Sequence, residues 1–262
     1  MDYTEQNFIY LLSAVVLFFM IPSFLVLSTG VVAPYGRYAE VASSGLSWGW
    51  GVPCRTAWIL QELPSLAGPL ICYAVSDRRE IDANVVLLTY WCCHYVNRTL
   101  VFPCRMRGGK KTPFGVFVAA LVFCMINGYC NGRFLAEYAV YDKDHLSSPC
   151  FIIGSVVFWT GLFINFHSDG ILRDLRKPGE VGYKIPYGGM FTYISGANYF
   201  GEIIEWIGFA IASGGAIPAV AFALATFLNI APRACSHHNW YLQKFDDEYK
   251  KLNRKRLVPF IY

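Results

Sequence analysis

Seven long apolar segments, separated by shorter polar ones, set the pattern of this chain of 262 residues. A helix needs about 20 apolar residues to cross the roughly 30 Å hydrocarbon layer of a bilayer, and several segments lie near the lower limit of that length. The segments are residues 8–32, 57–75, 85–102, 114–129, 151–166, 193–213 and 217–230. The pattern predicts an all-α integral membrane protein with seven transmembrane helices.

The first apolar segment, residues 8–32, is preceded by Asp2 and Glu5 and by no basic residue. A signal peptide has a basic start and a shorter apolar centre, so this segment is predicted to be a retained anchor helix. No internal repeat or long linker divides the chain. We therefore expect one membrane-embedded domain over residues 1–262, with an N-terminal anchor at 1–32 and a basic cytosolic tail at 233–262.

The polar connections alternate in charge. Residues 103–113 and 167–192 are rich in Arg and Lys, and the tail from residue 233 holds seven basic residues against three acidic ones. The connection at residues 130–150 is acidic instead, with Glu137, Asp142 and Asp144. Because basic connections stay on the cytosolic side, the N-terminus is predicted to be lumenal and the C-terminus cytosolic.

Composition agrees with a membrane protein and argues against several other classes. The chain is 55% hydrophobic and 15% charged, whereas soluble domains carry roughly 25% charged residues. The net charge of +4 is modest, and no basic tract is interleaved with aromatic residues, so no nucleic-acid partner is expected. The nine cysteines form no CxxC pair, and the adjacent histidines His237 and His238 point about 100° apart on a helix. No metal site is predicted.

Polar and ionisable residues inside the apolar segments each cost about 3 kcal/mol on insertion scales, so each needs a reason. One reading is that they satisfy one another as structural ion pairs, for example Arg98 with Glu202. The other is that they line an internal polar cavity for a ligand, a proton or an ion, and the number of carboxylates favours this reading. The residues concerned are Gln61, Glu62, His94, Tyr95, Arg98, Asn127, Asn198, Glu202 and Glu205.

The stretch at residues 165–186, NFHSDGILRDLRKPGEVGYKIP, is dense in polar groups. Asn165, Asp169 and Arg173 are spaced i, i+4 and i+8, which places them on one face of a helix that leaves the membrane. Charge alone is equally compatible with an ordinary basic cytosolic loop. No GxGxxG or P-loop motif is present, so a nucleotide bound here would not use a Rossmann unit.

These motifs together resemble the membrane steroid 5α-reductases (3-oxo-5α-steroid 4-dehydrogenases), with the type 1 group nearest in pattern. The resemblance covers the chain from about residue 34 to its end. The matching segments are AWILQELPS at 57–65, HYVNRT at 94–99, MRGGK at 106–110, NGY at 127–129, the whole of 165–186, GGMFTYISGANYFGEIIEWIGFA at 188–210, HHNWYLQKF at 237–245 and VPFIY at 258–262.

The resemblance implies a monomeric, multi-pass enzyme of the endoplasmic reticulum membrane. It would use NADPH to reduce the 4,5 double bond of 3-oxo-4-ene steroids such as testosterone, progesterone or androstenedione. Glu62 and Tyr95 match the family pair that hydrogen-bonds the steroid 3-oxygen, where negative charge develops during hydride transfer to carbon 5. A low-dielectric cavity would favour the protonated Glu62 that such a donor requires. Trp58 and Trp206 are expected to line the apolar slot for the steroid.

The resemblance also implies a set of residues for NADPH, whose phosphates suit guanidinium partners. Lys184 stands where type 2 enzymes have Arg, and Ser236 replaces the first histidine of a triple run found in some members. The implied set is Tyr35, Arg98, Asn165, Asp169, Arg173, Arg176, Tyr183, Lys184, Asn198, Glu202, Arg233, His237 and Tyr241, with Arg107 and Lys110 as further candidates.

Three other functions were weighed. A related reductase of polyprenols or enoyl-CoA thioesters shares C-terminal motifs, but the QELPS and GEIIEW segments favour a steroid. An ion-coupled transporter also uses intramembrane carboxylates, although broken helices in two similar halves are not seen. A membrane methyltransferase that uses S-adenosylmethionine remains a further alternative.

Overall fold

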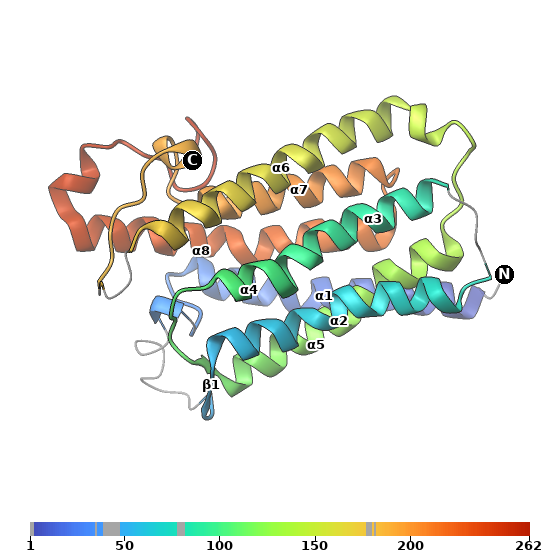
Figure 1. The fold of residues 1–262 in the computed structure, drawn as a ribbon, viewed down its shortest axis with the longest axis horizontal. Coiled ribbons are helices and arrows are strands. Elements are labelled where there is room, and N and C mark those ends of the chain that lie inside the picture. Colours follow the sequence, from blue (N-terminus) through green and yellow to red (C-terminus); the bar gives the residue numbers. More distant parts are fainter. Residues whose placement is uncertain (1–2, 35, 39–47, 78–81, 177–179, 181) are drawn as a thin grey trace.

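The computed structural model describes residues 3–34, 36–38, 48–77, 82–176, 180 and 182–262. Its long helices run roughly parallel to one axis and form an elongated bundle (Figure 1). They are α1 (Tyr3–Ser28), α2 (Cys54–Val75), α3 (Ala83–Val96), α5 (Phe114–Arg133), α6 (Pro149–Asp174), α7 (Ala197–Ala212) and α8 (Ile217–Lys250), and α4 (Phe102–Arg105) is a single turn. The fold of the described residues is nearly all-α, as predicted.

The β-structure of the described residues is small. Strand β1 (Gly51–Val52) pairs antiparallel with β2 (Thr112–Pro113), and an isolated bridge joins Ile194 to Lys255. The β1–β2 ladder lies beside the start of α2 and the start of α5 and ties these two helix ends together (Figure 1).

Four helical stretches are long and apolar enough to cross a membrane, namely Thr4–Ser28, Phe114–Tyr138, Pro149–Asp174 and Ile217–Lys250. Helices α3 and α7 contain only 14 and 16 residues, and α2 carries polar residues in its middle. These three helices are the ones that bring most of the intramembrane polar groups into the bundle. Their polar faces therefore need neighbours inside the protein rather than lipid.

Several predicted boundaries were wrong, because hydropathy detects where a helix is apolar and not where it ends. Helix α6 continues to Asp174, and α8 continues to Lys250, so the predicted basic tail is helical over its first half. Helix α3 continues through a π-helical turn at Asn97–Val101 into α4. Helix α7 starts at Ala197 rather than near residue 193, because Gly189–Thr192 forms a 3₁₀ turn.

Helices α6 and α7 approach each other closely because glycines face the partner backbone. A Cβ on Gly161 would lie 2.2 Å from the Glu205 nitrogen, and one on Gly208 would lie 2.2 Å from the Phe158 nitrogen. Small residues of this kind let helices pack backbone to backbone in membranes, where no hydrophobic effect drives helices together. The contact extends to Asn165, the first of the three predicted polar residues of α6, because a Cβ on Gly201 would lie 2.4 Å from the Asn165 nitrogen.

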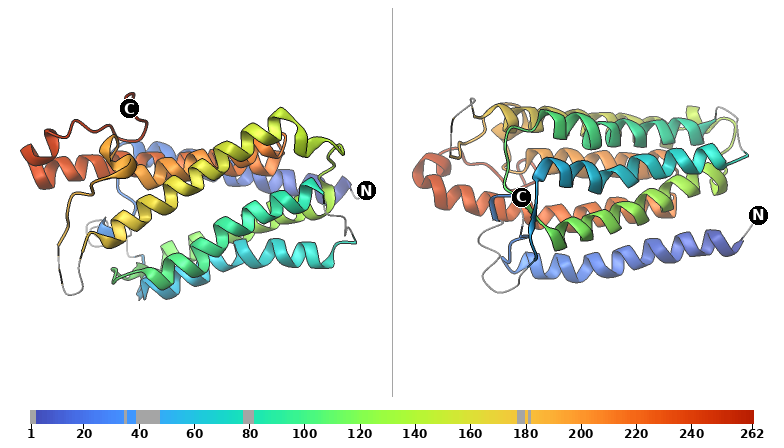
Figure 2. Two further views of the ribbon diagram at one scale, coloured as in Figure 1. Left: turned by 45° about the horizontal axis from the view of Figure 1, so that its top comes forward. Right: turned by 60° about the horizontal axis from the view of Figure 1, so that its bottom comes forward.

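Helix α1 lies at the edge of the bundle (Figure 2), where it packs against α8 and α5. Its first turn is held by Glu5, whose carboxylate receives hydrogen bonds from Arg133 at 2.9 and 3.0 Å and from Tyr129 at 2.8 Å. Tyr138 also contacts Glu5. The acidic residue taken as evidence against a signal peptide therefore anchors α1 to α5.

Candidate functional site

A pocket of about 640 Å³ lies inside the bundle and is lined by residues of α1, α2, α3, α5, α6, α7 and α8. Its wall has an apolar part and a cationic part. Apolar side chains from α5 and α8, including Val116, Ala119, Phe123 and Phe222, form one part. The other part is dominated by arginines. Such a pocket suits a pair of ligands, one apolar and one anionic.

Arg98 joins three helices within the polar part of the pocket. Its Nη1 lies 3.3 Å from Asp169 Oδ2 on α6, and its Nη2 lies 3.7 Å from Glu202 Oε2 on α7. The guanidinium also lies over the rings of Trp58 and Phe102, at 4.9 and 5.0 Å. The structural ion pair considered for Arg98 and Glu202 is therefore present, and both partners line the pocket. Arg98 sits in the π-helical turn after α3, a distortion frequently found at functional sites.

The predicted stripe of Asn165, Asp169 and Arg173 lies along one helix, α6. Asp169 and Arg173 line the pocket. Asn165 is fully buried behind them, and its Nδ2 donates to the Asn198 carbonyl oxygen at 3.0 Å and to Glu202 Oε2 at 3.4 Å. Asn165 thus supports the two α7 residues that face the pocket.

The electrostatic character of the polar part is strongly positive. Three carboxyl groups line the pocket, those of Glu62, Asp169 and Glu202. Seven guanidinium groups line it as well. They belong to Arg37, Arg98, Arg105, Arg107, Arg173, Arg176 and Arg233. This excess of cations suits a ligand with several phosphate groups, since guanidinium binds phosphate oxygens through two parallel hydrogen bonds.

Arg37 is a lining residue that the sequence reasoning missed. It belongs to the 3₁₀ turn Gly36–Tyr38 between α1 and α2, and its guanidinium lies 4.3 Å from the Trp240 ring centroid. Its Nη1 is buried without a hydrogen-bond acceptor among the described residues. The signal available in the sequence was an arginine between two tyrosines in the connection of residues 29–53, and this signal is weak.

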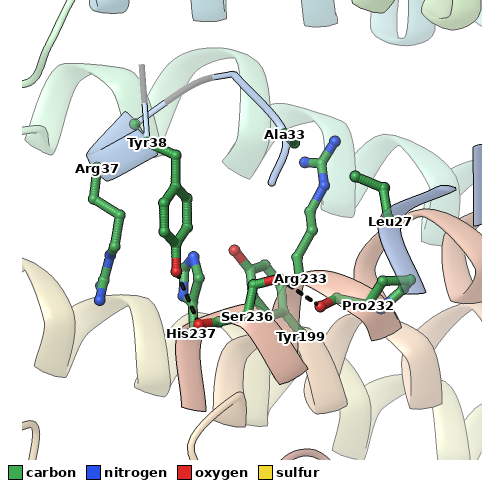
Figure 3. Close-up of a pocket in the computed structure, with 10 residues that line it drawn as sticks. Leu27, Ala33, Arg37, Tyr38, Tyr199, Pro232, Arg233, Ser236 and His237 are labelled. Carbon is green, nitrogen blue, oxygen red and sulfur yellow. Dashed lines mark hydrogen bonds between the residues drawn. The ribbon is translucent and has the colours of Figure 1, made fainter. Parts of the chain in front are cut away.

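A smaller pocket of about 90 Å³ adjoins the first between this 3₁₀ turn and α8. Figure 3 shows Arg37 beside His237, with the Tyr38 hydroxyl donating to the Ser236 carbonyl oxygen at 3.0 Å. Arg37, Tyr199, Arg233 and His237 line both pockets. The small pocket is therefore a side extension of the polar part.

Glu62 on α2 and Tyr95 on α3 both line the pocket. The Glu62 carboxyl group is contacted by Gln61 Nε2 at 3.5 Å and by Cys124 Sγ at 3.8 Å. The Tyr95 hydroxyl oxygen accepts a hydrogen bond from Asn127 Nδ2 at 3.2 Å. The two residues come from different helices, and each presents an oxygen that can donate a proton to an acceptor in the pocket.

The other predicted site residues fall into two groups. Trp58, Arg176, Asn198, Glu202, Arg233, His237 and Tyr241 line the pocket, together with the candidate Arg107. Tyr183 and Lys184 do not: the Tyr183 ring packs on Trp240 with centroids 4.8 Å apart, and Lys184 pairs with Glu180 at 2.5 Å on the surface. Tyr35 lies outside the described residues, and the candidate Lys110 is not among the lining residues.

Trp206 and Glu205 lie behind the pocket wall. Trp206 is fully buried in the aromatic core, with ring centroids 5.2 Å from Trp91 and 4.4 Å from Phe222. Glu205 is equally buried, and its Oε1 lies 2.7 Å from His94 Nδ1. Within the described chain, no three His, Cys, Asp or Glu side chains gather as a metal site would require.

Comparison with known proteins adds an independent line of evidence. Residues 110–262 match the family model described as 3-oxo-5-alpha-steroid 4-dehydrogenase. A Bos taurus protein named 3-oxo-5-alpha-steroid 4-dehydrogenase 1 is 50% identical over 235 residues, which cover 88% of each chain.

The chain belongs to the 3-oxo-5-alpha-steroid 4-dehydrogenase family. The Homo sapiens type 1 protein is 48% identical over 87% of this chain and 86% of its own, and a Sus scrofa type 2 protein is 44% identical over 87% of each. The predicted likeness to type 1 enzymes and the oxidoreductase class are confirmed. The pocket, with Glu62 and Tyr95 in its wall, therefore belongs to a member of an enzyme family.

Proposed function

We propose that the protein reduces the 4,5 double bond of 3-oxo-4-ene steroids, with NADPH as the reductant. The observation that carries this proposal is the single pocket whose cationic part adjoins an apolar part holding Glu62 and Tyr95. The names of its relatives support the steroid. Testosterone, progesterone and androstenedione are the substrates to examine first.

The residues present fit a phosphorylated dinucleotide. The buried Arg37 Nη1 has no acceptor among the described residues, and six further arginines line the same pocket. Arg98, Asp169, Arg173, Arg176, Asn198, Glu202, Arg233, His237 and Tyr241 would hold NADPH, with Asn165 supporting Glu202 from behind. When bound, NADPH supplies the hydride that is added to carbon 5 of the steroid.

The chain's own contribution is electrostatic. Addition of a hydride at carbon 5 moves negative charge onto the steroid 3-oxygen, and donors placed there stabilise the enolate as it forms. Tyr95 and the protonated form of Glu62 supply two such donors. Protonation at carbon 4 then completes the reduction. Tyr95 is buried and Glu62 is half-buried, and the exclusion of water by bound ligands would strengthen each hydrogen bond.

The same proposal includes the setting of the enzyme. Arg105 and Arg173 lie in the last turns of α4 and α6, and Arg107 and Arg176 follow these two helices. Basic helix ends of this kind stay in the cytosol. The cofactor part of the pocket would then face the cytosol, where it meets its ligand. We propose a monomer in the endoplasmic reticulum membrane with seven spans, a lumenal N-terminus and a cytosolic C-terminus.

A direct assay tests the proposal. Membranes containing the protein are incubated with labelled testosterone and NADPH, and the products are separated to detect the 5α-reduced steroid. We expect product with NADPH and much less with NADH, because the arginines of the pocket can bind the 2′-phosphate that distinguishes the two. No product from any of several 3-oxo-4-ene steroids would refute the proposal.

Two substitutions separate the roles of the two parts of the pocket. Glu62→Gln should lower kcat by about 10- to 100-fold, because it weakens one donor at the 3-oxygen, and should leave dinucleotide affinity unchanged. Arg176→Ala should raise the KM for NADPH about tenfold with a small effect on the steroid, because it removes a phosphate partner. Steady-state kinetics with each ligand varied in turn measure both, and equal effects of either substitution on the two ligands would contradict the division.

A further inference from the structure

Three buried polar side chains form a hydrogen-bond chain that ends at Tyr95. Asn131 Nδ2 donates to Asn127 Oδ1 at 2.9 Å, and Asn127 Nδ2 donates to the Tyr95 hydroxyl oxygen at 3.2 Å. Relative exposure is 5% for Asn127, and 3% for Asn131 and Tyr95. Neither asparagine lines the pocket, so their amides act on the ligand only through Tyr95.

The direction of this chain is fixed by a backbone group. Asn131 Nδ2 also donates to the backbone carbonyl of Asn127, at 3.3 Å. A carbonyl can only accept, so the nitrogen of Asn131, and not its oxygen, must face Asn127. Asn127 therefore turns its own oxygen to Asn131 and its nitrogen to Tyr95. The Tyr95 oxygen is an acceptor on this side, and its proton is directed elsewhere.

The remaining polar neighbours favour the pocket as the destination of that proton. Among the described residues, Tyr95 has no side-chain hydrogen bond other than the one from Asn127. The hydroxyl proton of Ser65, on the neighbouring helix α2, is donated to the Cys124 carbonyl at 3.1 Å. The Ser65 carbonyl is already engaged by Trp91 Nε1 at 2.7 Å. The Tyr95 proton is thus left for an acceptor within the pocket that Tyr95 lines.

Glycines hold the asparagines at the required distance. Gly128 and Gly132 follow Asn127 and Asn131 directly, and a Cβ at these positions would lie 2.7 Å from the Pro64 carbonyl oxygen and 2.5 Å from Pro69 Cα on α2. One face of α5 is therefore fixed against α2, while the adjacent face reaches α3. The segment NGYCNG at residues 127–132 repeats both features at i, i+4 spacing.

We propose that Asn127 and Asn131 are positioning residues that orient the Tyr95 hydroxyl so that its proton points at the steroid 3-oxygen. This inference rests on the proposed function. It gives a catalytic reason for two asparagines in an apolar helix, where each would otherwise cost free energy. The competing explanation is that they only join α5 to α3 and stabilise the fold.

A double-mutant cycle on kcat separates the two explanations. Tyr95→Phe should lower kcat by about 10²- to 10³-fold, the usual effect of losing one donor to a developing oxyanion. Asn127→Ala should lower kcat about tenfold with an unchanged KM for NADPH. In the Tyr95→Phe background, Asn127→Ala should have no further effect beyond about twofold, because the group it orients is gone. A purely structural role predicts that the tenfold loss persists there.

Rates are expressed per folded enzyme, counted by dinucleotide titration. Asn84→Ala is the matched control, because Asn84 is also a buried asparagine that joins two parts of the bundle. Its Nδ2 donates to the Leu135 and Ala139 carbonyls at 2.7 and 2.9 Å. Asn84 does not line the main pocket. Asn84→Ala should lower stability and leave kcat unchanged. If Asn127→Ala does not fold, Asn131→Leu replaces it in the cycle. Asn131→Leu removes the hydrogen bond that holds the Asn127 amide in one orientation. It should lower kcat about threefold, and only when Tyr95 is present.

The outcomes are distinct. If the wild type turns over and the losses of kcat in the cycle are additive, this inference is overturned and the proposed function stands. The same holds if neither asparagine variant loses kcat. Absence of wild-type turnover overturns the proposed function, and the inference with it. A loss of kcat that disappears in the Tyr95→Phe background supports both.

Discussion

At the scale of single residues, the structure divides the carboxylates of α7 between two tasks. Glu202 faces the pocket and meets Arg98, whereas Glu205 turns into the core and pairs with His94. The two residues are three positions apart on one helix, and three positions rotate a helix by about 300°. The sequence analysis listed both among the polar residues of the apolar segments, and only the packing of α3 and α6 against α7 separates their roles.

Loss of the Glu205 carboxyl group should destabilise the fold. Glu205→Ala leaves His94, which is 2% exposed, without its partner at 2.7 Å, and an unpaired buried polar group costs about 1–3 kcal/mol. Glu205→Gln keeps a hydrogen-bonding group of the same shape and should cost less. Thermal unfolding of the purified protein in detergent measures the order. Glu248→Ala, at an exposed carboxylate of α8, is the control, and equal midpoints for Glu205→Ala and wild type would contradict the prediction.

At the scale of elements, two pairs of helices are held by glycine contacts, and each pair positions one part of the pocket. The α6–α7 contact brings Asn165 to Glu202, and the α2–α5 contact brings Cys124 to Glu62. The sequence predicted the apolar centres of these helices but not their partners. Glycines inside an apolar segment look alike to a hydropathy pattern, whether they face lipid or a neighbouring backbone.

Substitution of a contact glycine should weaken the α6–α7 pair. A Cβ on Gly208 would lie 2.2 Å from the Phe158 nitrogen, so Gly208→Ala forces the helices apart and should cost about 1–3 kcal/mol. Gly170→Ala in α6 is the matched control, because its Cβ would meet only Arg173 Nη2, at 3.6 Å, and alanine favours a helix by about 1 kcal/mol. Thermal unfolding should lower the midpoint for Gly208→Ala alone. A midpoint at or above that of wild type for this variant would show that the contact tolerates a methyl group.

At the scale of the whole molecule, the sequence predicted the class of fold, and most of the residues that the family motifs singled out line the pocket. They did not predict which segments, distant in the sequence, lie next to each other in the fold. Arg37 reaches the pocket only because the connection after α1 folds over Trp240 and Tyr241 of α8. Trp206 instead packs away from the pocket, because Trp91 and Phe222 surround it. Such outcomes depend on which helix faces meet, and a one-dimensional pattern does not contain that information.

The arrangement of the bundle leads to a testable prediction about which side of the membrane Lys143 and Glu248 face. The N-terminus and the C-terminus lie toward opposite ends of the bundle's long axis (Figure 2), and the acidic connection with Lys143 precedes α6, whereas Glu248 lies near the end of α8. Three long helices, α6, α7 and α8, separate these two exposed residues. If each helix crosses the membrane once, the two positions must face opposite compartments.

Cysteine labelling in sealed microsomes checks this statement. A membrane-impermeant maleimide added outside should modify a Glu248→Cys variant and not a Lys143→Cys variant, because the tail from residue 233, with seven basic residues against three acidic ones, is expected to stay in the cytosol. Detergent should then expose Lys143→Cys to the same reagent. The wild-type chain gives the background from its own cysteines, of which Cys93, Cys104 and Cys150 are exposed. Labelling of both variants in intact microsomes would mean that α6, α7 and α8 do not cross an odd number of times, and labelling of Lys143→Cys alone would reverse the proposed orientation.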